Sequence, residues 1–561
     1  MSSPLVECVP NFSEGRDAAI IAQIAEAIES VEGVKLLNVD PGKATNRTVY
    51  TFVGAPEPVC EAAFRSAKRA SELIDMRQHH GEHPRFGALD VCPLIPISGI
   101  TMAETAEYAR RLGQGMGDEL GMSIYLYENA ATTEERRNLA TVRAGEYEGL
   151  ERKLTDPHWK PDFGPATFNA KLGATAVGAR DFLIAYNVNL NTTSTRRANA
   201  IAFDIREKGR QAREGDPVTG KPLLDSDGNP IWIPGSLKAV KAIGWFIDEY
   251  GIAQISINLT NLNETSIHEC FEECVRKADA RGIRVTGSEI VGLVPLAALL
   301  DAGRYFLLKQ ERSTGVSDAE LIKIAVRSMG LDELAPFDPN ERIIEYAIRD
   351  RSKKRLVDLS VQAFVEETAS ESPAPGGGSV AATLGALGAA LATMVANLSS
   401  HKRGWDERWK EFSDWADKGK ACHDELLRLV DADTDAFNGI MTAFGLPKST
   451  DEEKARRKQA IADATRKAIE IPLQVMEASL AAMGPIRAMA EIGNPNSVSD
   501  AGVGALCARS AVLGAYLNVK INCAGFGDAE FVAKTLVRAQ AIAAQAEADE
   551  KEILAIVESR M

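Results

Sequence analysis

The sequence feature that most constrains the fold is a change of pattern near Asp358. Before this point, short apolar segments alternate with amphipathic helical ones, beginning with a predicted strand at Leu5–Val9, a polar turn at Asn11–Gly15 and a predicted helix at Ala18–Ile28, and a later strand is predicted at Ile252–Leu259. Beyond it, alanine becomes frequent, strand patterns end, and helical patterns continue to the last residues, with separate helices predicted at Val361–Thr368, Asp451–Ala482 and Ile486–Gly493. Alternation predicts an α/β or α+β sandwich, whereas unbroken helical periodicity predicts a helix bundle. We therefore predict a multidomain protein in which two α/β (α+β sandwich) subdomains are followed by an all-α helical-bundle domain.

The predicted domain boundaries lie where this pattern restarts or changes. A chain of 561 residues is too long for a single core, so several domains are expected. We assign residues 1–182 to the first α/β subdomain and residues 183–349 to the second, because a new series of strands and helices begins there. A charged joint, R-D-R-S-K-K-R, follows, and residues 350–359 are interpreted as a linker. Residues 360–561 form the predicted helical domain.

Charge and cysteine usage limit the classes of function. The formal net charge of −15 argues against general nucleic-acid binding, which needs a basic surface. An anionic substrate must therefore be held by local basic groups. The eight cysteines are scattered and only Cys270 and Cys274 lie close together, so we expect the reduced thiols of a cytoplasmic protein. The first residues carry neither a basic segment nor a long apolar core, which argues against a signal peptide.

One uncharged segment, Ser372–Ser400, is long enough to cross a membrane. Its large apolar residues form one row at helical spacing: Leu384, Leu387, Leu391, Met394 and Leu398. Its small residues form a second row, four apart: Ala381, Gly385, Ala389 and Thr393. Small residues permit close contact between helices, so we interpret the segment as a tightly packed helix of the bundle and expect no membrane span.

The stretch Gln78–Asp90 concentrates groups that exchange protons near neutral pH. It contains His79, His80 and His83, and Pro84 biases His83 towards an extended backbone. A metal site that uses His80 and His83 is one interpretation, although the proline argues against the helical HExxH arrangement. A structural loop with idle histidines is another. We favour a proton-handling active site, because histidine titrates closest to pH 7.

Four further polar segments each have a functional and a structural interpretation. Gly164–Gly173 is a loop by composition and either binds a ligand or only connects. The glycines of Ser372–Ser379 suit an anion at a helix start, although Ser379 can equally be an N-cap. Val430–Phe437 carries three carboxylates at alternate positions, which cannot all share one helix face, so either one turns inward or all are solvated. Gly493–Asp500 either binds a polar heterocycle or turns the chain.

Several motifs resemble known enzyme families. Those that resemble glutamate formimidoyltransferase are V-E-C-V-P-N-F-S-E-G (Val6–Gly15), T-N-R-T-V-Y-T-F-V-G (Thr45–Gly54), H-H-G-E-H-P-R-F-G-A-L-D-V-C-P (His79–Pro93) and R-A-G-E-Y-E (Arg143–Glu148). Those that resemble formimidoyltetrahydrofolate cyclodeaminase are A-P-G-G-G-S-V-A-A (Ala374–Ala382), L-V-D-A-D (Leu429–Asp433) and P-K-S-T-D-E-E-K (Pro447–Lys454). The chain therefore resembles the bifunctional formimidoyltransferase-cyclodeaminase family over essentially its whole length. One departure is Gly215–Ser236, a segment rich in Gly, Pro and Asp that looks longer than its counterpart in the family.

The resemblance implies two consecutive reactions and the residues that carry them. A formimidoyl group passes from N-formimidoyl-L-glutamate to N5 of tetrahydrofolate, after which cyclisation gives 5,10-methenyltetrahydrofolate and ammonia. The transferase histidine of the family corresponds to His83, and the cyclodeaminase aspartate corresponds to Asp433. Residues 1–182 and 183–349 correspond to the two formimidoyltransferase subdomains, and residues 360–561 to the cyclodeaminase domain. The folate-binding loop corresponds to Gly164, Pro165, Ala166, Thr167, Phe168, Asn169, Ala170, Lys171, Leu172 and Gly173.

The resemblance also implies which partners to expect. Tetrahydrofolate, with its polyglutamate tail, and N-formimidoylglutamate are the expected small molecules, the folate acting as a cosubstrate. We expect no tightly bound cofactor and no metal, because neither reaction needs one. A homo-oligomer built from dimers is expected from the family. Two alternatives remain: a formyltransferase joined to a methenyltetrahydrofolate cyclohydrolase, and a non-catalytic folate-binding scaffold.

Overall fold

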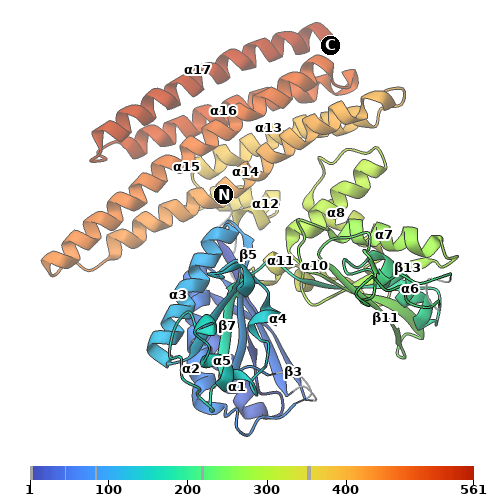
Figure 1. Ribbon diagram of the computed structural model, residues 1–561. Coiled ribbons are helices and arrows are strands. Elements are labelled where there is room, and N and C mark those ends of the chain that lie inside the picture. The colour runs from blue at the N-terminus through green and yellow to red at the C-terminus, as the bar shows by residue number, and fades with distance from the viewer. Residues whose placement is uncertain (1–3, 44–45, 82–84, 216–219, 350–354) are drawn as a thin grey trace. The chain divides into compact units, whose positions relative to one another are not determined.

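The computed structural model describes residues 4–43, 46–81, 85–215, 220–349 and 355–561. The chain divides into two compact units. The first contains Met1–Ala298 and Met329–Arg349, and the second contains Leu299–Ser328 and Asp350–Met561. The fold class predicted from the sequence is confirmed, because sheets with helices occupy the first unit and long packed helices dominate the second (Figure 1).

A mixed sheet of seven strands forms the first part of unit 1 (Figure 1). Its strands are β1 (Leu5–Cys8), β2 (Asn11–Phe12), β3 (Val34–Gly42), β4 (Arg47–Gly54), β5 (Leu89–Ser98), β6 (Ser123–Glu128) and β7 (Ala174–Ala179). The order is β1-β4-β2-β5-β7-β6, with β3 on the outer side of β4. β5, β7 and β6 run parallel, and the other pairs are antiparallel. The segment predicted as a polar turn after β1 thus contributes strand β2.

Three helices cover one face of this sheet: α1 (Ala18–Glu29), α2 (Pro56–Leu73) and α3 (Met102–Leu120) (Figure 1). Each begins at a recognisable signal. The Asp17 side chain caps α1, Pro56 occupies the first position of α2, and Thr101 and Glu104 form a capping box on α3. Alternate strand residues such as Val6 and Cys8 point into the core beneath these helices. Glu7, between them, points to the opposite face.

The opposite face is covered only in part. The short helices α4 (Leu139–Val142) and α5 (Leu150–Leu154) bury a smaller cluster that includes Tyr125 and Val91. The rest of this face carries polar residues of β1 and β2, which an antiparallel pair can expose to solvent. It is therefore the face on which a ligand can reach the sheet.

A four-stranded antiparallel sheet forms the second part of unit 1. Its order is β11 (Val240–Ile247), β12 (Ile252–Leu259), β8 (Ile184–Leu190) and β13 (Val285–Val291). Helices α6 (Thr195–Ile205) and α7 (Ile267–Asp279) accompany it (Figure 1). Between α6 and β11, a small ribbon pairs β9 (Arg210–Gln211) with β10 (Trp232–Ile233). The sequence predicted the β12 bounds correctly but missed β13, whose T-G-S-E centre is unlike a buried strand.

The remaining elements before the helical domain are helical. They are α8 (Leu296–Lys309), α9 (Asp318–Met329), α10 (Pro339–Arg342) and α11 (Ile344–Ala347). Residues Leu299–Ser328, which contain most of α8 and α9, group with the helical unit. Within that unit, the Thr314 hydroxyl lies 2.6 Å from Asp417 Oδ2, and Lys420 Nζ lies 2.9 Å from Asp318 Oδ1.

Long helices make up the rest of unit 2 (Figure 1). They are α12 (Val361–Thr368), α13 (Gly377–Ser400), α14 (Trp409–Gly445), α15 (Asp451–Ile492), α16 (Val498–Cys523) and α17 (Ala529–Arg560). The prediction of separate helices at Asp451–Ala482 and Ile486–Gly493 is wrong, because α15 is continuous through Pro472 and Pro485. Both prolines are buried in the bundle, so tertiary packing offsets the cost of about 3 kcal/mol for a proline inside a helix.

Helix α13 packs through its small residues. Ala381, Gly385, Ala389 and Thr393 are all buried, and a Cβ at Gly385 would lie 2.5 Å from Ser479 Oγ. The row of large residues faces outward instead: Leu387 is 54% exposed, Met394 38% and Leu398 47%. Among the described residues, two segments, Gly377–Ser400 and Pro495–Cys523, are long and apolar enough to cross a membrane. Of the most apolar stretch of the first, 61% is buried inside the unit, as in the core helix of a bundle.

Candidate active sites

The histidine stretch is tied to its surroundings on both sides of the proposed catalytic residue. His83, with Glu82 and Pro84, lies outside the described residues. His79 is buried, and its Nε2 lies 2.6 Å from the carbonyl oxygen of Asn46. Burial lowers the pKa of His79, so this imidazole is neutral and serves as a structural donor. The predicted cluster therefore contains one idle histidine.

Arg85 fixes the other side of the stretch. Its guanidinium donates to the carbonyl oxygens of Met76 and His79, and its Nε lies 2.9 Å from Glu148 Oε1. The same guanidinium lies 4.4 Å from the centre of the Tyr147 ring. Backbone carbonyls, a carboxylate and an aromatic ring thus hold the Arg85 side chain in place. Together, His79 and Arg85 fix the two ends of the segment that contains His83.

The predicted folate loop, Gly164–Gly173, packs directly against this region. The Met76 amide donates to the Lys171 carbonyl at 2.9 Å, and the Tyr147 hydroxyl donates to the Ala170 carbonyl at 2.5 Å. Gly87 and Gly173 form a bridge between the two segments. Two stretches that lie far apart in the sequence, and were singled out independently, therefore meet at one end of the sheet.

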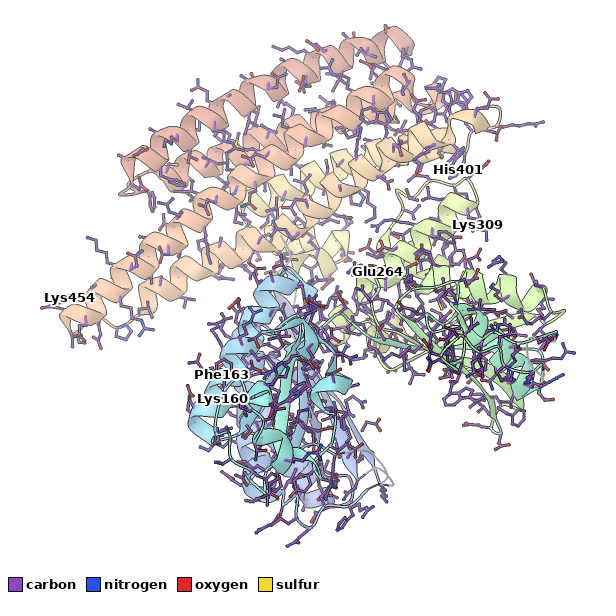
Figure 2. The ribbon with its side chains drawn as sticks, in the orientation of Figure 1. Lys160, Phe163, Glu264, Lys309, His401 and Lys454 are labelled. Atoms are coloured by element: carbon purple, nitrogen blue, oxygen red, sulfur yellow. The ribbon has the colours of Figure 1, made fainter. Side chains whose placement is uncertain are left out.

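Glycine is required at both ends of that loop. Gly164 and Gly173 have φ values of +77° and +68°, and a Cβ at Gly173 would lie 2.4 Å from the Phe86 carbonyl oxygen. Phe163, which directly precedes the loop, pairs with Ile124 and is labelled in Figure 2. Inside the loop, the Asn169 side chain accepts hydrogen bonds from the amides of Lys171 and Leu172. The loop therefore has a defined conformation, and its folate-binding role stays a prediction.

A buried ionic network lies beside these loops. The Asp90 carboxylate is fully buried and accepts from Arg47 and, at 2.9 Å, from Arg143 Nη2. Arg47 Nε also donates to Asn11 Oδ1 at 3.1 Å. Two guanidinium groups thus share one buried carboxylate where the network meets the open face of the sheet.

A cavity of about 790 Å³ opens on that face. It is lined by Asn11, Val91 and Pro93 from the sheet, by Arg143 from the network, and by Arg180 beyond β7. Its volume is within the range of small-molecule sites in proteins. Its lining combines apolar surface with charged groups of both signs: the cations Arg143, Arg180 and Lys241 and the carboxylates Glu128, Glu146 and Asp181.

A second cavity, of about 480 Å³, shares Arg180 and Leu183 with the first. Glu7 lines it from β1 and is itself buried. Burial raises the pKa of Glu7 to about 7, and the Arg180 guanidinium opposes that rise. Glu7 is therefore a further group in unit 1 that can exchange a proton near neutral pH, at a position that the sequence pattern predicted only as part of a strand.

The candidate cyclodeaminase site lies in unit 2, where α14 faces the first turn of α13. The Ser379 hydroxyl lies 3.1 Å from Asp433 Oδ2 and 2.9 Å from the Val430 carbonyl oxygen. A Cβ at Gly378 would lie 2.2 Å from Asp433 Oδ1, so only glycine permits this approach. The Asp433 carboxylate therefore lies beside Gly378, at the N-terminal end of α13, where the helix dipole is positive. The N-cap interpretation of Ser379 is wrong, because α13 begins at Gly377 with Gly376 as its N-cap.

The three carboxylates of the acidic run have different environments. Burial raises the pKa of Asp433, and hydrogen bonds from Ser379 oppose that rise. Asp431 Oδ1 accepts from the Leu356 amide at 2.7 Å, and burial raises its pKa as well. Asp435 is exposed. The prediction that one carboxylate turns inward is confirmed, and the fully solvated alternative is wrong.

The polar segment Gly493–Asp500 of the helical domain has a structural role. The Asn494 amide donates to Ser399 Oγ at 2.9 Å, and Pro495–Ser497 form a short 3-10 turn that leads into α16. Its contacts match the turn interpretation. Among the described residues, no group of three or more His, Cys, Asp or Glu side chains is placed to hold a metal ion.

The sequence missed residues whose role depends on distant contacts. Arg47, Asp90 and Arg143 all lie within the motifs quoted above, yet nothing in the sequence pairs them. Their separations of 43 and 53 residues place them together only after the sheet forms. Ser379 was identified as part of a helix start, but its contact with Asp433 spans 54 residues.

Three family models match successive parts of the chain. The family model described as the formiminotransferase domain, N-terminal subdomain, matches residues 5–180. The model of the formiminotransferase domain matches residues 185–349, and that of formiminotransferase-cyclodeaminase matches residues 360–541. The fold and the matches together define a chain that joins a formiminotransferase part to a cyclodeaminase part.

Individual relatives cover the whole chain or one of its parts. Formimidoyltransferase-cyclodeaminase of Rattus norvegicus is 44% identical over 559 residues, covering 100% of this chain and 99% of the relative. Glutamate formimidoyltransferase of Streptococcus pyogenes serotype M1 is 42% identical, covering 54% of this chain and 93% of the relative. Methenyltetrahydrofolate cyclohydrolase of Methylorubrum extorquens is 36% identical, covering 36% of this chain and 97% of the relative. The chain belongs to the formimidoyltransferase-cyclodeaminase family.

Proposed function

We propose that this chain catalyses two consecutive reactions on tetrahydrofolate, with His83 and Asp433 as the proton-handling groups. The first reaction transfers the formimidoyl group from N-formimidoyl-L-glutamate to N5 of tetrahydrofolate. The second cyclises 5-formimidoyltetrahydrofolate to 5,10-methenyltetrahydrofolate and releases ammonia. Both steps belong to histidine degradation and one-carbon metabolism. The observation that carries the proposal is 44% identity over the full length to a relative with both activities in its name.

His83 acts in the transfer step. N5 of tetrahydrofolate attacks the formimidoyl carbon, the bond from that carbon to the glutamate nitrogen breaks, and glutamate leaves. His83 removes the proton from N5 and returns one to the departing amine, which a single imidazole can do in turn. Its support is the motif G-E-H-P-R together with the anchored ends of this stretch at His79 and Arg85.

The folate loop and the basic network bind the two substrates of that step. Gly164–Gly173 contacts tetrahydrofolate as a cosubstrate, next to the segment that contains His83. The carboxylates of N-formimidoylglutamate match the positive charge of Arg143 in the cavity of about 790 Å³. Nothing in this proposal requires a tightly bound cofactor, a metal, a nucleic acid or a membrane, and we infer a cytoplasmic location for the enzyme.

Asp433 acts in the cyclisation step. N10 attacks the formimidoyl carbon held on N5, and the bond from that carbon to the imino nitrogen breaks. A carboxyl with a raised pKa delivers the proton that lets this nitrogen leave as ammonia. The half-buried position of Asp433 supports this role, because partial burial raises its pKa. Asp431 is already engaged by the Leu356 amide, and Asp435 is exposed.

We infer that residues 1–182 and 183–349 are the formimidoyltransferase subdomains and residues 360–561 the cyclodeaminase domain, with 350–359 between them. We also infer that the enzyme forms a homo-oligomer built from dimers. The outward row of Leu387, Met394 and Leu398 supports it, because an aligned apolar row of this kind is usually covered by a partner.

A second candidate function rests on the cyclohydrolase relative. Because that protein is 36% identical to this chain over 202 residues, part of the chain can also serve methenyltetrahydrofolate hydrolysis. The test supplies N-formimidoylglutamate and tetrahydrofolate, and follows ammonia together with the absorbance of methenyltetrahydrofolate. The proposal expects equal amounts of both products. Methenyltetrahydrofolate hydrolysis without ammonia release from formimidoylglutamate would favour the second candidate, and neither activity would favour a non-catalytic scaffold.

A further inference from the structure

A basic groove lies in unit 1 between α6 and the small ribbon of β9 and β10. Its volume is about 390 Å³, within the range of small-molecule sites. Four arginines line it: Arg196, Arg206, Arg210 and Arg213. Phe203 and Trp232 add aromatic surface, and Trp232 is 40% exposed. In a chain of net charge −15, four arginines around one groove are a local exception that calls for an explanation.

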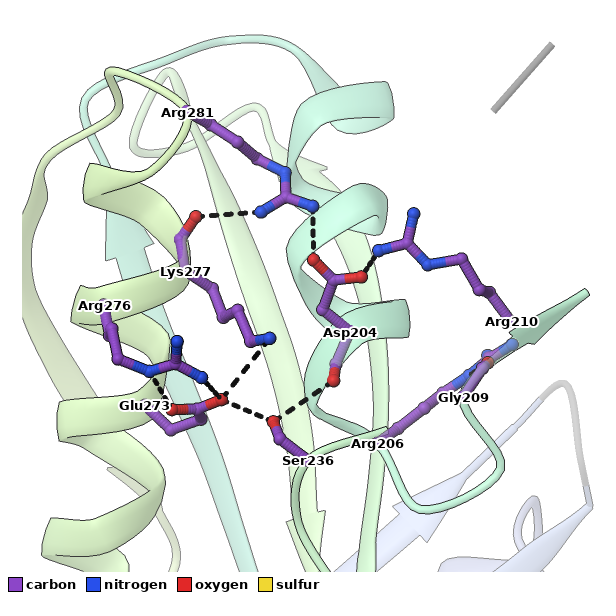
Figure 3. Close-up of polar contacts among 9 residues, drawn as sticks. All are labelled: Asp204, Arg206, Gly209, Arg210, Ser236, Glu273, Arg276, Lys277 and Arg281. Atoms are coloured by element: carbon purple, nitrogen blue, oxygen red, sulfur yellow. Dashed lines mark hydrogen bonds and ion pairs between the residues drawn. The ribbon is translucent and has the colours of Figure 1, made fainter. Parts of the chain in front are cut away.

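The carboxylates near the groove are already engaged by other cations. Asp204 accepts from both Arg210 and Arg281, which leaves one carboxylate shared by two guanidinium groups (Figure 3). Glu273 is held by Arg276, at 2.5 Å, and by Lys277 and Ser236 (Figure 3). Neither carboxylate is left to neutralise the remaining arginines of the groove.

Three of the arginines have no carboxylate partner within the described part of the chain. Arg206 donates through Nε to the Gly209 carbonyl at 2.8 Å, and Arg213 donates to the Gly220 carbonyl at 2.8 Å. Arg196 is exposed, and no ion pair within the described ranges engages it. Carbonyl oxygens fix the direction of a guanidinium but do not neutralise it. The groove therefore presents the charge of three guanidinium groups.

The aromatic rings position these cations. The Arg206 guanidinium lies 4.0 Å from the centre of the Phe203 ring, and Lys208 Nζ lies 4.5 Å from the centre of the Trp232 ring. These cation–π contacts hold the charged groups of Arg206 and Lys208 against the aromatic rings at the rim of the groove. An incoming anion thus meets fixed donors beside an exposed indole ring.

We propose that this groove binds an anion with a phosphate group and a flat ring, that is, a ligand of the nucleotide class. Because three guanidinium groups carry three positive charges, a ligand with at least two negative charges is the best electrostatic match. Phosphate presents several oxygens at once to planar donors from different elements, here α6 and the end of β9. The exposed Trp232 ring offers a stacking surface for a base. Nothing in this proposal depends on the transferase or cyclodeaminase reaction.

Calorimetric titration of the full chain with ADP tests the proposal. ADP is expected to bind at one site, and Arg196→Gln to weaken it about tenfold or more, because a charge-assisted contact is lost. Arg197→Gln is the matched control: this neighbour on α6 is exposed and does not line the groove. Trp232→Ala is expected to weaken ADP but not inorganic pyrophosphate, since pyrophosphate has no ring. Arg196→Gln keeps its full formimidoyl transfer rate, which verifies folding.

Three outcomes would overturn the proposal. The first is no saturable binding of ADP at millimolar concentration. The second is equal binding by the full chain and by its Arg196→Gln variant, which would put the nucleotide elsewhere. The third is tighter binding of tri-γ-glutamate than of ADP, with the same loss on Arg196→Gln. That would make the groove a carboxylate site rather than a phosphate site.

Discussion

The candidate transferase site is assembled from loops at one end of a mixed sheet, whereas the candidate cyclodeaminase site lies where two long helices meet. In the first, Arg85, Tyr147 and the loop Gly164–Gly173 hold one another through backbone carbonyls. In the second, Asp433 is held by a glycine and a serine of one helical turn. The loops bring several different groups together at one site, whereas the two packed helices hold a single carboxylate in one position.

Each site prepares its proton-handling group in a different way. Histidine titrates near pH 7 without help, so a loop that only presents and orients it is sufficient. A carboxyl needs burial before it can donate a proton near neutral pH, and a packed helix pair provides that burial. Two chemistries in one chain therefore use two architectures, and the following substitutions test that contrast.

The largest effect is expected at the loop site. His83→Ala should lower formimidoyl transfer by roughly two to four orders of magnitude, because proton transfer to and from the amines is lost. Cyclisation of supplied 5-formimidoyltetrahydrofolate should continue at the normal rate. His80→Ala is the matched control and should change little. Loss of both activities in a folded His83→Ala enzyme would mean that the two sites are not separate.

The corresponding change at the helical site is Asp433→Asn, which keeps the shape but cannot donate a proton. Ammonia release should fall by roughly two to three orders of magnitude, while 5-formimidoyltetrahydrofolate forms normally and accumulates. Asp431→Asn and Asp435→Asn are the controls. If either of them stops cyclisation and Asp433→Asn does not, the proton-handling role belongs elsewhere in the acidic run.

A smaller effect is expected from moving Asp433 without altering it. A Cβ at Gly378 would lie 2.2 Å from Asp433 Oδ1, so Gly378→Ala should displace the carboxylate. Misplacement of this size should lower cyclisation by about ten- to a hundredfold. Gly376→Ala is the matched control, since its Cβ would meet no atom nearer than 3.9 Å. Equal rates for the two variants would show that the close approach does not matter.

The smallest effect concerns pH. Burial raises the pKa of Asp433 and Ser379 lowers it, so Ser379→Ala should raise it further. A general acid acts in its protonated form, so activity falls as the pH rises through its pKa. In Ser379→Ala this fall should therefore occur at higher pH, measured as kcat/KM for cyclisation. Thr383→Ala, whose hydroxyl bonds the Ser379 carbonyl instead, should leave the profile in place. A shift to lower pH would contradict the assignment.

The sequence predicted elements whose signals are local. Strand β12 and helix α12 have the predicted bounds, because period-two and helical patterns are complete within them. Strand β7, with the sequence A-T-A-V-G-A, and β13 were missed, since their strand character comes from neighbours in the sheet. The continuity of α15 through two prolines likewise depends on burial in the bundle.

The site residues show the same contrast between local sequence signals and contacts made by distant residues. Residue chemistry alone identified the histidine stretch and the acidic run, and the family resemblance selected His83 and Asp433 within them. The contact of Gly378 and Ser379 with Asp433, and the pairing of Arg47 and Arg143 with Asp90, join residues from different elements. No periodicity in a single sequence encodes such contacts, so only the folded chain reveals them.

If the two reactions follow each other as proposed, the imino nitrogen stays with the formimidoyl carbon through the transfer and leaves only in the cyclisation. N-formimidoylglutamate labelled with ¹⁵N at the imino position, supplied with tetrahydrofolate to the full chain, tests it directly. All released ammonia is expected to carry the label, glutamate to carry none, and the Asp433→Asn enzyme to retain the label on the folate. Unlabelled ammonia, or labelled ammonia released without tetrahydrofolate, would contradict it.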